Sequence, residues 1–401
     1  MSGENAGPAA SASKPALRVG MVGYSFMGAM HSHAWRTAPR FFDLPMRPEL
    51  AVLAGRNKSA VETAAEKMGW RDTETDWRAL VERDDVDLID ICTPGDTHAE
   101  IAIAALAAGK HVLCEKPLAN SVEEAGHMAA AAKAAEAKGV FAMCGFSYRR
   151  TPALTLARRL VQQGRIGTIR HIRAQYLQDW LSSESAPLTW RLDKSKSGSG
   201  ALGDIGAHSI DAAQYVSGLP IVSVSGLLQT FVHERPVGGT LVGLGGAGAS
   251  DGAKGPVTVD DAAIFTTRFD GGAVGVFEAT RFALGRKNSM RLEINGSLGS
   301  LAFDFENMNS LEFYDGAEPP ETAGFRTINV TEPEHPYTGN WWPAGHGLGY
   351  EHGFTHQVVD LVNAISAGST PSPSFAEALQ VQKILHAVEQ SAEAESVWQH
   401  V

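Results

Sequence analysis

Cysteine is scarce in this sequence, and the few cysteines present are poorly placed for disulfides. The chain of 401 residues has three, Cys92, Cys114 and Cys144, and each lies in an apolar run. An odd number of widely spaced cysteines argues against a disulfide framework and against a zinc site. We therefore expect small buried hydrophobic side chains in a reducing compartment, and we predict a cytoplasmic location.

The sequence also lacks a basic cluster and a long apolar run. Its formal net charge is −11, which argues against nucleic acid or an anionic membrane surface as the main partner. No apolar run approaches the roughly 18 residues that a membrane helix needs. Charged residues make up 20% and apolar residues 44% of the chain, a mix typical of globular proteins with room for two domains.

Small and polar residues fill the first sixteen positions, MSGENAGPAASASKPA, and predict a disordered tail that has no signal-peptide core. Residues 17–146 then alternate regularly between apolar strands and helices. This alternation predicts an α/β fold with one parallel, doubly wound Rossmann domain. The predicted strands are 17–22, 50–54, 86–92, 111–114 and 140–145, and the predicted helices are 29–37, 59–68, 99–108 and 122–138.

The first of these strands runs into a glycine turn, Gly23-Tyr24-Ser25-Phe26-Met27-Gly28, that opens a helix. Strand, glycine turn and helix form the setting of a dinucleotide fingerprint, in which the pyrophosphate rests on the helix N-terminus. Ser25 stands in place of the middle glycine and is small enough for close approach. We expect Gly23, Ser25, Phe26 and Met27 to bind the cofactor; an ordinary strand-to-helix turn is the alternative.

The second strand ends in Gly55-Arg56, where an acidic residue would normally bind the ribose hydroxyls of NAD. Without a carboxylate there is no repulsion against a 2′-phosphate, and an arginine can bind that phosphate as a fork. Gly55 and Arg56 therefore favour NADP over NAD as the cofactor. The alternative is an exposed arginine at the start of a helix.

A carboxylate, an ammonium and a proline follow the strand 111–114, in the order Glu115-Lys116-Pro117. Ligands of open α/β sheets bind at the carboxyl ends of the strands. Proline restricts the preceding residue to extended conformations, so Lys116 has a defined direction. Its ammonium can bind a substrate hydroxyl or stabilise a developing alkoxide. The alternative is a surface lysine in a strand-to-helix turn.

The strand beside it ends in another turn, Thr93-Pro94-Gly95-Asp96-Thr97-His98. This turn lies at the carboxyl edge of the same predicted sheet. We expect Thr93, Pro94 and His98, together with Glu115, to lie beside the nicotinamide ribose.

Beyond residue 146 the pattern changes to long alternating strands joined by short turns, which predict a largely antiparallel sheet in an α+β domain over 147–401. The predicted strands are 169–178, 222–232, 261–269, 273–281, 289–295, 300–305 and 310–314, with helices over 152–162 and 375–391. The glycine-rich segment 237–255 predicts a mobile loop.

Within this domain, Asp204 and His208 are four residues apart at the start of a predicted helix, so they share one face. Histidine has the unperturbed pKa best suited to proton transfer near neutral pH, and a carboxylate one turn away can orient its ring. An Asp/His pair can also bind a metal, but no third ligand has suitable spacing, and we predict none. A capped structural histidine is the alternative.

The glycine turn, the Glu115-Lys116-Pro117 turn and the Gly203-Asp204-Ile205-Gly206-Ala207-His208 helix, in this order, resemble the glucose–fructose oxidoreductase/inositol dehydrogenase (Gfo/Idh/MocA) family over residues 17 to about 395. The resemblance implies a Rossmann domain followed by an open antiparallel sheet that often mediates oligomerisation, so a homo-dimer or tetramer is expected. It also implies NAD(P)-dependent oxidation of a ring hydroxyl of a sugar, glycoside, anhydrosugar or cyclitol.

By motif, the resemblance implies that Lys116 contacts substrate and nicotinamide, that His208 is the general acid/base, and that Asp204 positions substrate and histidine. Further stretches resemble the branch that contains levoglucosan dehydrogenase and related 3-oxidising glycoside dehydrogenases. From these stretches we expect substrate contacts from Tyr148, Arg149, Asp179, Trp180 and Arg191. Core packing for the aromatic residues and surface ion pairs for the arginines are the alternatives.

Three other functions remain open at this stage. One is a non-catalytic sensor of dinucleotide and sugar, although the intact Lys116, Asp204 and His208 weigh against it. Another is a sugar–sugar oxidoreductase with tightly bound NADP. The third is a reductase of a non-sugar substrate such as biliverdin, which would not require the Asp204/His208 pair.

Overall fold

The strand–helix alternation of the first third of the chain forms a parallel sheet in the computed structural model, which describes residues 14–242, 245–248 and 253–401. Six strands pair in the order β3-β2-β1-β4-β5-β6. They are β1 (Ala16–Val22), β2 (Arg47–Ala54), β3 (Asp72–Glu74), β4 (Leu88–Ile91), β5 (His111–Cys114) and β6 (Ala142–Cys144). The helices between them are α1 (Phe26–Phe41), α2 (Lys58–Met68), α3 (Trp77–Glu82), α4 (His98–Ala107) and α5 (Val122–Glu136). This is the predicted Rossmann topology.

The strand order reverses between β1 and β4, the position where open α/β sheets bind ligands. The central strands β4 and β5 bury almost every side chain, as strands covered on both faces do. Side-chain caps define two helix starts: Asn57 accepts from the amide of Ala60 in α2, and Ser121 from that of Glu124 in α5. The buried strands therefore fix where their carboxyl ends, and the turns that follow, lie.

The structure describes only the last residues of the predicted tail, but it describes all three cysteines. Residues 1–13 lie outside the described residues, whereas Ala16 already belongs to β1 and the Pro15 carbonyl accepts a hydrogen bond from the Arg47 amide. All three cysteines are buried with free thiols, as expected, and burial raises the pKa of each. Among the described residues, no helix is long and apolar enough to span a bilayer.

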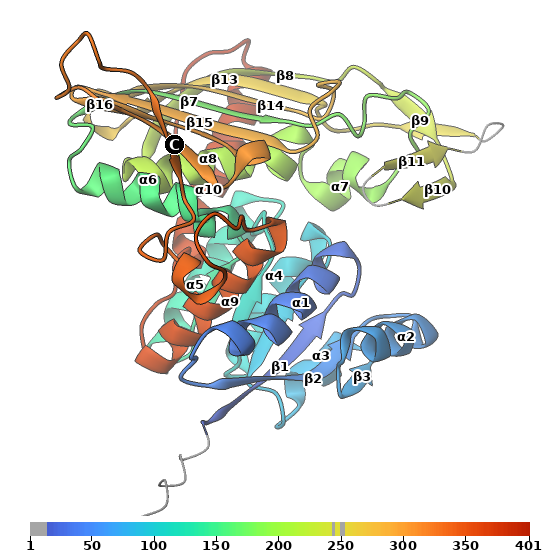
Figure 1. Ribbon diagram of the computed structural model, residues 1–401. Helices are drawn as coiled ribbons and strands as arrows, with labels where there is room; N and C mark the ends of the chain where they lie inside the picture. The colour runs from blue at the N-terminus through green and yellow to red at the C-terminus, as the bar shows by residue number, and fades with distance from the viewer. Residues whose placement is uncertain (1–13, 243–244, 249–252) are drawn as a thin grey trace, which may run out of the picture.

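The second domain is a mixed sheet laid over helices, in the order β18-β17-β16-β15-β7-β14-β13-β8-β19 (Figure 1). All its pairings are antiparallel except β7 with β14. Its strands are β7 (Ile169–Leu177), β8 (Ile221–Gln229), β13 (Ala262–Phe269), β14 (Val274–Thr280), β15 (Ser289–Gly296), β16 (Gly299–Asp304), β17 (Ser310–Asp315), β18 (Arg326–Asn329) and β19 (Gln399–His400). All seven predicted strands are present, and the short β18 and β19 were not predicted.

Helices α6 (Pro152–Gln162), α8 (Ala207–Ser217) and α10 (Phe375–Glu393) lie between this sheet and the Rossmann domain (Figure 1). Within the described part of the chain, no helix covers the opposite face of the sheet. A short helix, α7 (Lys194–Ser197), lies near one end of the layer.

The glycine-rich segment forms more structure than the predicted mobile loop. Two short antiparallel pairs occur there: β9 (Glu234–Pro236) with β12 (Lys254–Pro256), and β10 (Gly239–Val242) with β11 (Gly245–Gly248). Backbone hydrogen bonds need no particular side chains, so pairing is open to a glycine-rich sequence that shows no strand pattern. The loop prediction is therefore wrong for these strands.

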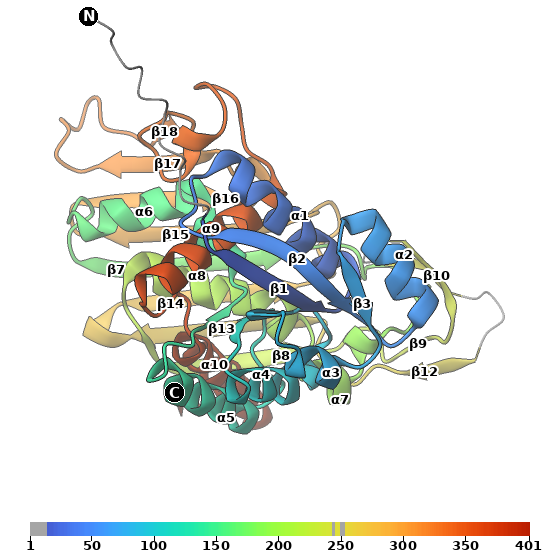
Figure 2. The ribbon, with the colours of Figure 1, turned by 90° about the horizontal axis from the view of Figure 1, so that it is seen from below.

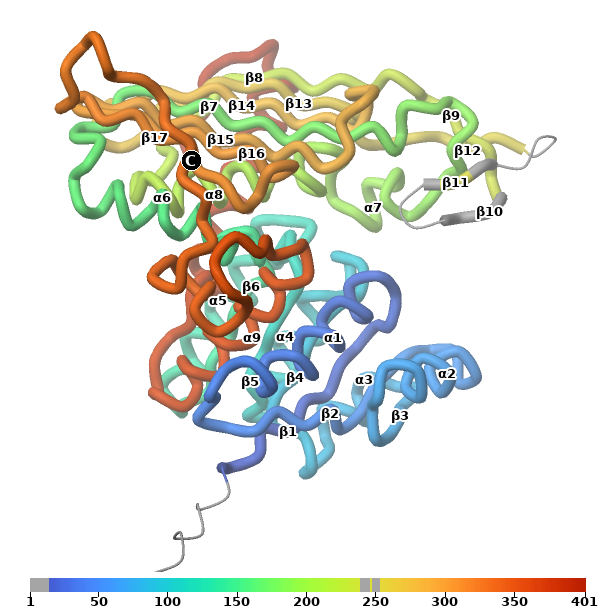
Figure 3. Tube along the Cα trace, viewed as in Figure 1, coloured from blue at the N-terminus to red at the C-terminus, as the bar shows by residue number. Residues whose placement is uncertain are grey.

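Helix α9 (Tyr350–Ala367) was not predicted, and it returns the chain to the first domain (Figures 2 and 3). It packs on α1, where Phe354, Val358 and Leu361 join a buried cluster with Trp35 and Ala38. All residues after 146 were expected to belong to a second domain, whereas α9 packs against the first. The two domains are thus joined by packing as well as by the connection near residue 146.

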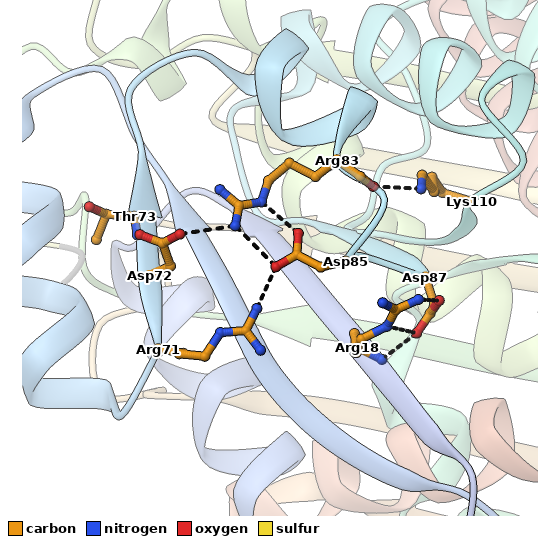
Figure 4. Close-up of polar contacts among 8 residues, drawn as sticks. All are labelled: Arg18, Arg71, Asp72, Thr73, Arg83, Asp85, Asp87 and Lys110. Carbon is orange, nitrogen blue, oxygen red and sulfur yellow. Dashed lines mark hydrogen bonds and ion pairs between the residues drawn. The ribbon is translucent and has the colours of Figure 1, made fainter.

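A cluster of charged side chains lies at the amino ends of the parallel strands (Figure 4). The glycine turn lies at the opposite, carboxyl edge of the sheet. Asp87 accepts three hydrogen bonds from Arg18, from the backbone amide at 2.8 Å, Nε at 2.9 Å and Nη2 at 2.6 Å. Burial opposes ionisation of Asp87, but the hydrogen bonds and charge of Arg18 outweigh it and lower the pKa of this carboxyl. Beside it, Asp85 bridges Arg71 and Arg83.

We predict that Asp87→Asn lowers the free energy of unfolding by about 1–3 kcal/mol at pH 7, because it removes a charged acceptor of three hydrogen bonds. A lowered folded-state pKa stabilises above the unfolded value of about 3.9 and loses this effect as pH falls. The gap between variant and wild type should therefore shrink below about pH 4 in urea unfolding. Asp72→Asn is the control, because Asp72 is about half exposed and accepts one bond from Arg83. Equal losses for both variants would contradict the prediction.

Candidate active site

A cavity of about 590 Å³ lies where the carboxyl ends of the Rossmann strands face the second domain. Residues from both domains line it, including the start of α1, the turns after β4 and β5, and the segment before α8. It contains these residues predicted from the sequence: Ser25, Phe26, Met27, Thr93, Pro94, His98, Glu115, Lys116, Tyr148, Arg191, Asp204 and His208. The structure thus brings together the two polar motifs, which are 88 residues apart in the chain.

Lys116 spans the boundary between the domains. Its ammonium donates to the backbone carbonyl of Asp204 at 2.6 Å and lies 3.5 Å from the carboxylate Oδ1. Its side chain is 15% exposed, so water screens this charge only weakly. The contacts with Asp204 therefore fix the Lys116 ammonium in the cavity wall. This geometry does not fit the alternative of a surface lysine in an ordinary turn.

Asp204 lies in a π-helical turn, Leu202–Gly206, that leads into α8. Burial would raise the pKa of its carboxyl, but the charges of Lys116, Arg191 and Arg281 outweigh burial and lower it to about 2. Arg281 is fully buried, with Nη1 3.6 Å from the Asp204 carboxylate. Asp260 caps the same segment, accepting from the amides of residues 200 and 202. Asp204 is therefore a fixed anion at neutral pH.

His208 follows in the first turn of α8, packed against aromatic rings. The Tyr148 ring stacks on the imidazole with 4.4 Å between centroids, and Phe146 meets its edge. Burial, followed by the charge of Lys116, lowers the pKa of His208 well below its usual value. Nδ1 is buried and has no hydrogen-bond partner among the described residues. His208 is thus neutral near pH 7, the form in which an imidazole can act as a base.

The relation of Asp204 to His208 differs from the predicted one. On a regular helix the two would share a face, but the wide π turn changes the register between them. Asp204 bonds with Lys116 and Arg281, and no hydrogen bond joins it to His208 in the described part of the chain. The aromatic rings around His208, rather than the carboxylate, hold the imidazole in place.

Several residues of the cavity were not predicted. Tyr176 and Asn288 form a chain with Tyr148: the two phenol oxygens are 2.5 Å apart, and Tyr176 donates to Asn288 Oδ1 at 2.6 Å. Burial raises the pKa of Tyr148 to about 12, so its hydroxyl remains protonated. Further lining residues without a sequence signal are Lys287, Tyr350 and Phe354. Lys287 lies in the loop before β15, and Tyr350 and Phe354 lie on α9, where no sequence motif marks them.

Three predicted substrate residues do not line the cavity. The guanidinium of Arg149 is buried and bound by Asp211 at 2.5 and 2.8 Å and by Glu377 at 2.6 Å. Asp179 pairs with Lys287 and accepts from the Gly285 amide. Trp180 donates to Gln178 and packs with Leu181. Their polar groups are already satisfied within the protein, which corrects the prediction that they touch substrate.

The glycine turn fits a dinucleotide. Gly23 has φ +100°, and a Cβ on Gly28 would lie 2.3 Å from the Gly23 carbonyl oxygen, so both positions require glycine. Ser25 precedes α1 without capping it through its side chain, and the first turn has no acidic residue. The amides at this helix start are therefore available to a phosphate group.

The adenosine end of the predicted site has a different surface. Gly55 packs under the ring of Tyr24, since a Cβ there would meet the ring at 2.0 Å. Arg56 is exposed at the carboxyl end of β2, before the α2 cap. Gly55 itself offers no carboxylate at the end of β2, and Arg56 presents a cation to solvent.

His98 ties two turns together at the same edge of the sheet. Its ring nitrogens lie 3.0 Å from the Pro117 carbonyl and 2.9 Å from the Thr93 carbonyl. The imidazole therefore holds the turn after β4 against the turn that carries Lys116. Thr93 and Pro94 line the same cavity, and their place beside a nicotinamide ribose stays a prediction.

Comparisons with known proteins agree over nearly the whole chain. The family model "Oxidoreductase family, NAD-binding Rossmann fold" matches residues 17–144, and "GFO/IDH/MocA C-terminal domain" matches residues 154–302. A levoglucosan dehydrogenase of Pseudarthrobacter phenanthrenivorans is 43% identical over 95% of this chain and 97% of its own length.

Solved structures give the same result. An oxidoreductase domain protein from Kribbella flavida is 64% identical, with a TM-score of 0.92, covering 96% of this chain and 99% of that one. Levoglucosan dehydrogenase in complex with NADH and L-sorbose is 41% identical with a TM-score of 0.90, over the same shares of both chains. The resemblance stated from the three motifs is confirmed: this chain belongs to the GFO/IDH/MocA family of oxidoreductases with an NAD-binding Rossmann fold.

Proposed function

We propose that this enzyme is an NAD(P)-dependent dehydrogenase that oxidises a ring hydroxyl of a sugar or anhydrosugar to the ketone. The observation that carries the proposal is the convergence of Lys116, Asp204 and a neutral His208 on one cavity that continues to the glycine turn. The names of the relatives support the substrate class, since they include a levoglucosan dehydrogenase and its complex with levoglucosan.

The reaction removes a proton and a hydride from the substrate, and each goes to a different acceptor. His208 removes the proton of the substrate hydroxyl, because its imidazole is neutral and the residue lines the cavity. The bound dinucleotide supplies the hydride acceptor in its nicotinamide ring. Lys116 stabilises the negative charge that develops on the substrate oxygen, and weak screening strengthens this effect.

Asp204 serves this step by holding Lys116 and not by orienting the histidine. Its carbonyl and carboxylate both contact the ammonium, while Arg281 supports the carboxylate from the other side. The chain Tyr148–Tyr176–Asn288 beside the imidazole offers hydroxyl and amide groups that suit a substrate with several hydroxyls.

We also propose that the enzyme works in the cytoplasm as a homo-oligomer. The unpaired buried thiols suit a reducing compartment. The face of the large sheet opposite the helices presents half-exposed Leu227, Ile264, Val274 and Val276, and Ile264 and Val276 line a hollow of about 510 Å³. Two such faces packed together would cover these side chains.

We predict that Lys116→Ala and His208→Ala each lower kcat by at least about 100-fold, since each removes a group that acts on the reacting hydroxyl. The measurement is nicotinamide reduction in a panel of levoglucosan, glucose, glucosides and myo-inositol. His386→Ala is the matched control, because this histidine lies half-exposed on α10 and should leave turnover unchanged.

Other outcomes of this panel would point elsewhere. Dinucleotide binding without turnover of any substrate would contradict the dehydrogenase and favour a sensor. Nicotinamide absorbance that stays with the purified protein would favour a sugar–sugar oxidoreductase with tightly bound NADP.

We propose NADP as the preferred cofactor, because Gly55 supplies no carboxylate and Arg56 can bind a 2′-phosphate. Arg56→Ala should then lower kcat/KM for NADP by about 10-fold or more, the effect of losing a charged hydrogen bond. The same variant assayed with NAD is the internal control and should change less than about twofold. An NAD preference in the wild type, or equal losses with both cofactors, would contradict this assignment.

We predict that Ile264→Arg reduces the molar mass measured by light scattering in solution, because a charge placed among the exposed apolar side chains of this face opposes contact between two copies. Leu284→Arg is the control, since Leu284 is more exposed than Ile264 and lies outside this face. A wild-type mass of one chain would contradict the oligomer, and an unchanged oligomeric mass in Ile264→Arg would contradict assembly through this face.

A further inference from the structure

A buried ionic triad lies directly behind the cavity wall, and the mechanism above does not use it. The imidazole of His31, on α1, lies between Asp90 of β4 and Glu115, which follows β5. Nδ1 is 2.9 and 3.0 Å from the two Asp90 oxygens, and Nε2 is 2.9 Å from Glu115 Oε1. All three side chains are at least nine-tenths buried. Burying two carboxylates around one imidazole is costly without a positive charge between them.

The hydrogen-bond partners determine where the protons lie. Asp90 accepts from Trp35 Nε1 at 2.7 Å and from the Cys92 thiol at 3.6 Å, besides His31. A carboxylate with this many donors is ionised, so His31 Nδ1 carries a proton. A proton must also lie between Nε2 and Glu115, because a lone pair facing a carboxylate oxygen at 2.9 Å would be repulsive.

The groups facing His31 favour placing this second proton on the imidazole. Burial alone would lower the pKa of His31, but the charge of Asp90 and the hydrogen bonds outweigh it and raise the pKa well above the usual value. The remaining neighbours are the Cys92 thiol, whose pKa burial raises, and the Phe354 ring of α9 at 5.6 Å. Neither of these competes for the positive charge.

Glu115 connects the triad to the catalytic lysine. Its Oε2 accepts from the backbone amide of Lys116 at 3.2 Å, and the residue lines the cavity at 5% exposure. A Cβ on Gly145 would lie 2.6 Å from Oε1, so the carboxylate has little room to move away. The imidazole therefore reaches the turn of Lys116 through one carboxylate.

The same side chains include the His31, Asp90 and Cys92 group, whose spacing would suit a metal ion. Both imidazole nitrogens are, however, already at hydrogen-bond distance from carboxylate oxygens. A metal between them would have to displace these bonds, so the geometry favours a proton-bearing bridge.

We propose that His31 is a positioning residue for the reaction: as an imidazolium between Asp90 and Glu115, it keeps Glu115 ionised and fixed in the cavity wall beside Lys116. This inference rests on the proposed function and adds to it a residue that does not itself touch the cavity. A fixed negative charge there favours the cationic oxidised nicotinamide over the neutral reduced form, so it supports binding before hydride transfer.

The test compares pH profiles of kcat/KM for His31→Gln, Glu115→Gln, the double variant and Trp35→Phe. In His31→Gln, one of the two buried carboxylates must take up a proton. The acid limb should therefore move at least one pH unit higher, and KM for the oxidised dinucleotide should rise more than kcat falls. The double variant should lose no more than Glu115→Gln alone, because both act through the same carboxylate.

Trp35→Phe is the control for a purely structural role. It removes another donor to Asp90, one turn further along α1, and should lower the melting temperature without moving the acid limb. An acid limb that stays in place in His31→Gln, or losses that multiply in the double variant, would overturn the proposal.

A second measurement separates this proposal from the proposed function. Nitrogen-15 NMR of labelled histidine should show one imidazole with both nitrogens still protonated well above the usual histidine pKa, and this signal should vanish in His31→Gln. A neutral His31 would overturn the proposal whatever the enzyme turns over. No turnover by the wild type, with a charged His31, would count against the proposed function alone.

Discussion

One contact across the domain boundary, between the ammonium of Lys116 and Asp204, determines the electrostatics of the cavity. Lys116 follows β5 of the Rossmann domain, and Asp204 precedes α8 of the other domain. This cation lowers the pKa of Asp204 and adds to burial in lowering the pKa of His208, so it helps to keep the carboxylate charged and the imidazole neutral. The two domains must therefore be correctly packed before the groups have the protonation states that the reaction needs.

The contact belongs to a longer line of alternating charge. Asp90, His31 and Glu115 lead from the Rossmann core to the turn of Lys116, and Asp204 and Arg281 continue it into the second domain. In a weakly screened interior each charge needs an opposite neighbour. His31 lies between Asp90 and Glu115, and Lys116 and Arg281 flank Asp204, while the step from Glu115 to Lys116 runs through the backbone amide. Helix α9 packs on α1 of the first domain and so helps to keep the two domains in place relative to each other.

The fold and the central site residues could be predicted because short sequence motifs mark them. The other site residues could not be predicted, because their contacts are with residues far away in the chain. Lys116 and His208 lie in short motifs next to a strand end and a helix start, so their positions follow from neighbouring residues. The sequence around Arg149 predicts a substrate contact. In the structure Arg149 instead binds Asp211 and Glu377, and Glu377 is 228 residues away in the chain. Tyr176 and Asn288 meet from separate elements, and the π turn at Asp204 leaves no pattern in the sequence.

The most direct test of the central claim is a double-mutant cycle on the contact between the domains. It compares kcat/KM for the wild type, Lys116→Met, Asp204→Asn and the double variant with the preferred sugar substrate. If the two residues act as one unit, each single variant loses about 100-fold or more, and the double variant loses hardly more than the worse single one. Losses that multiply would show that Asp204 acts independently of Lys116, and would contradict this account.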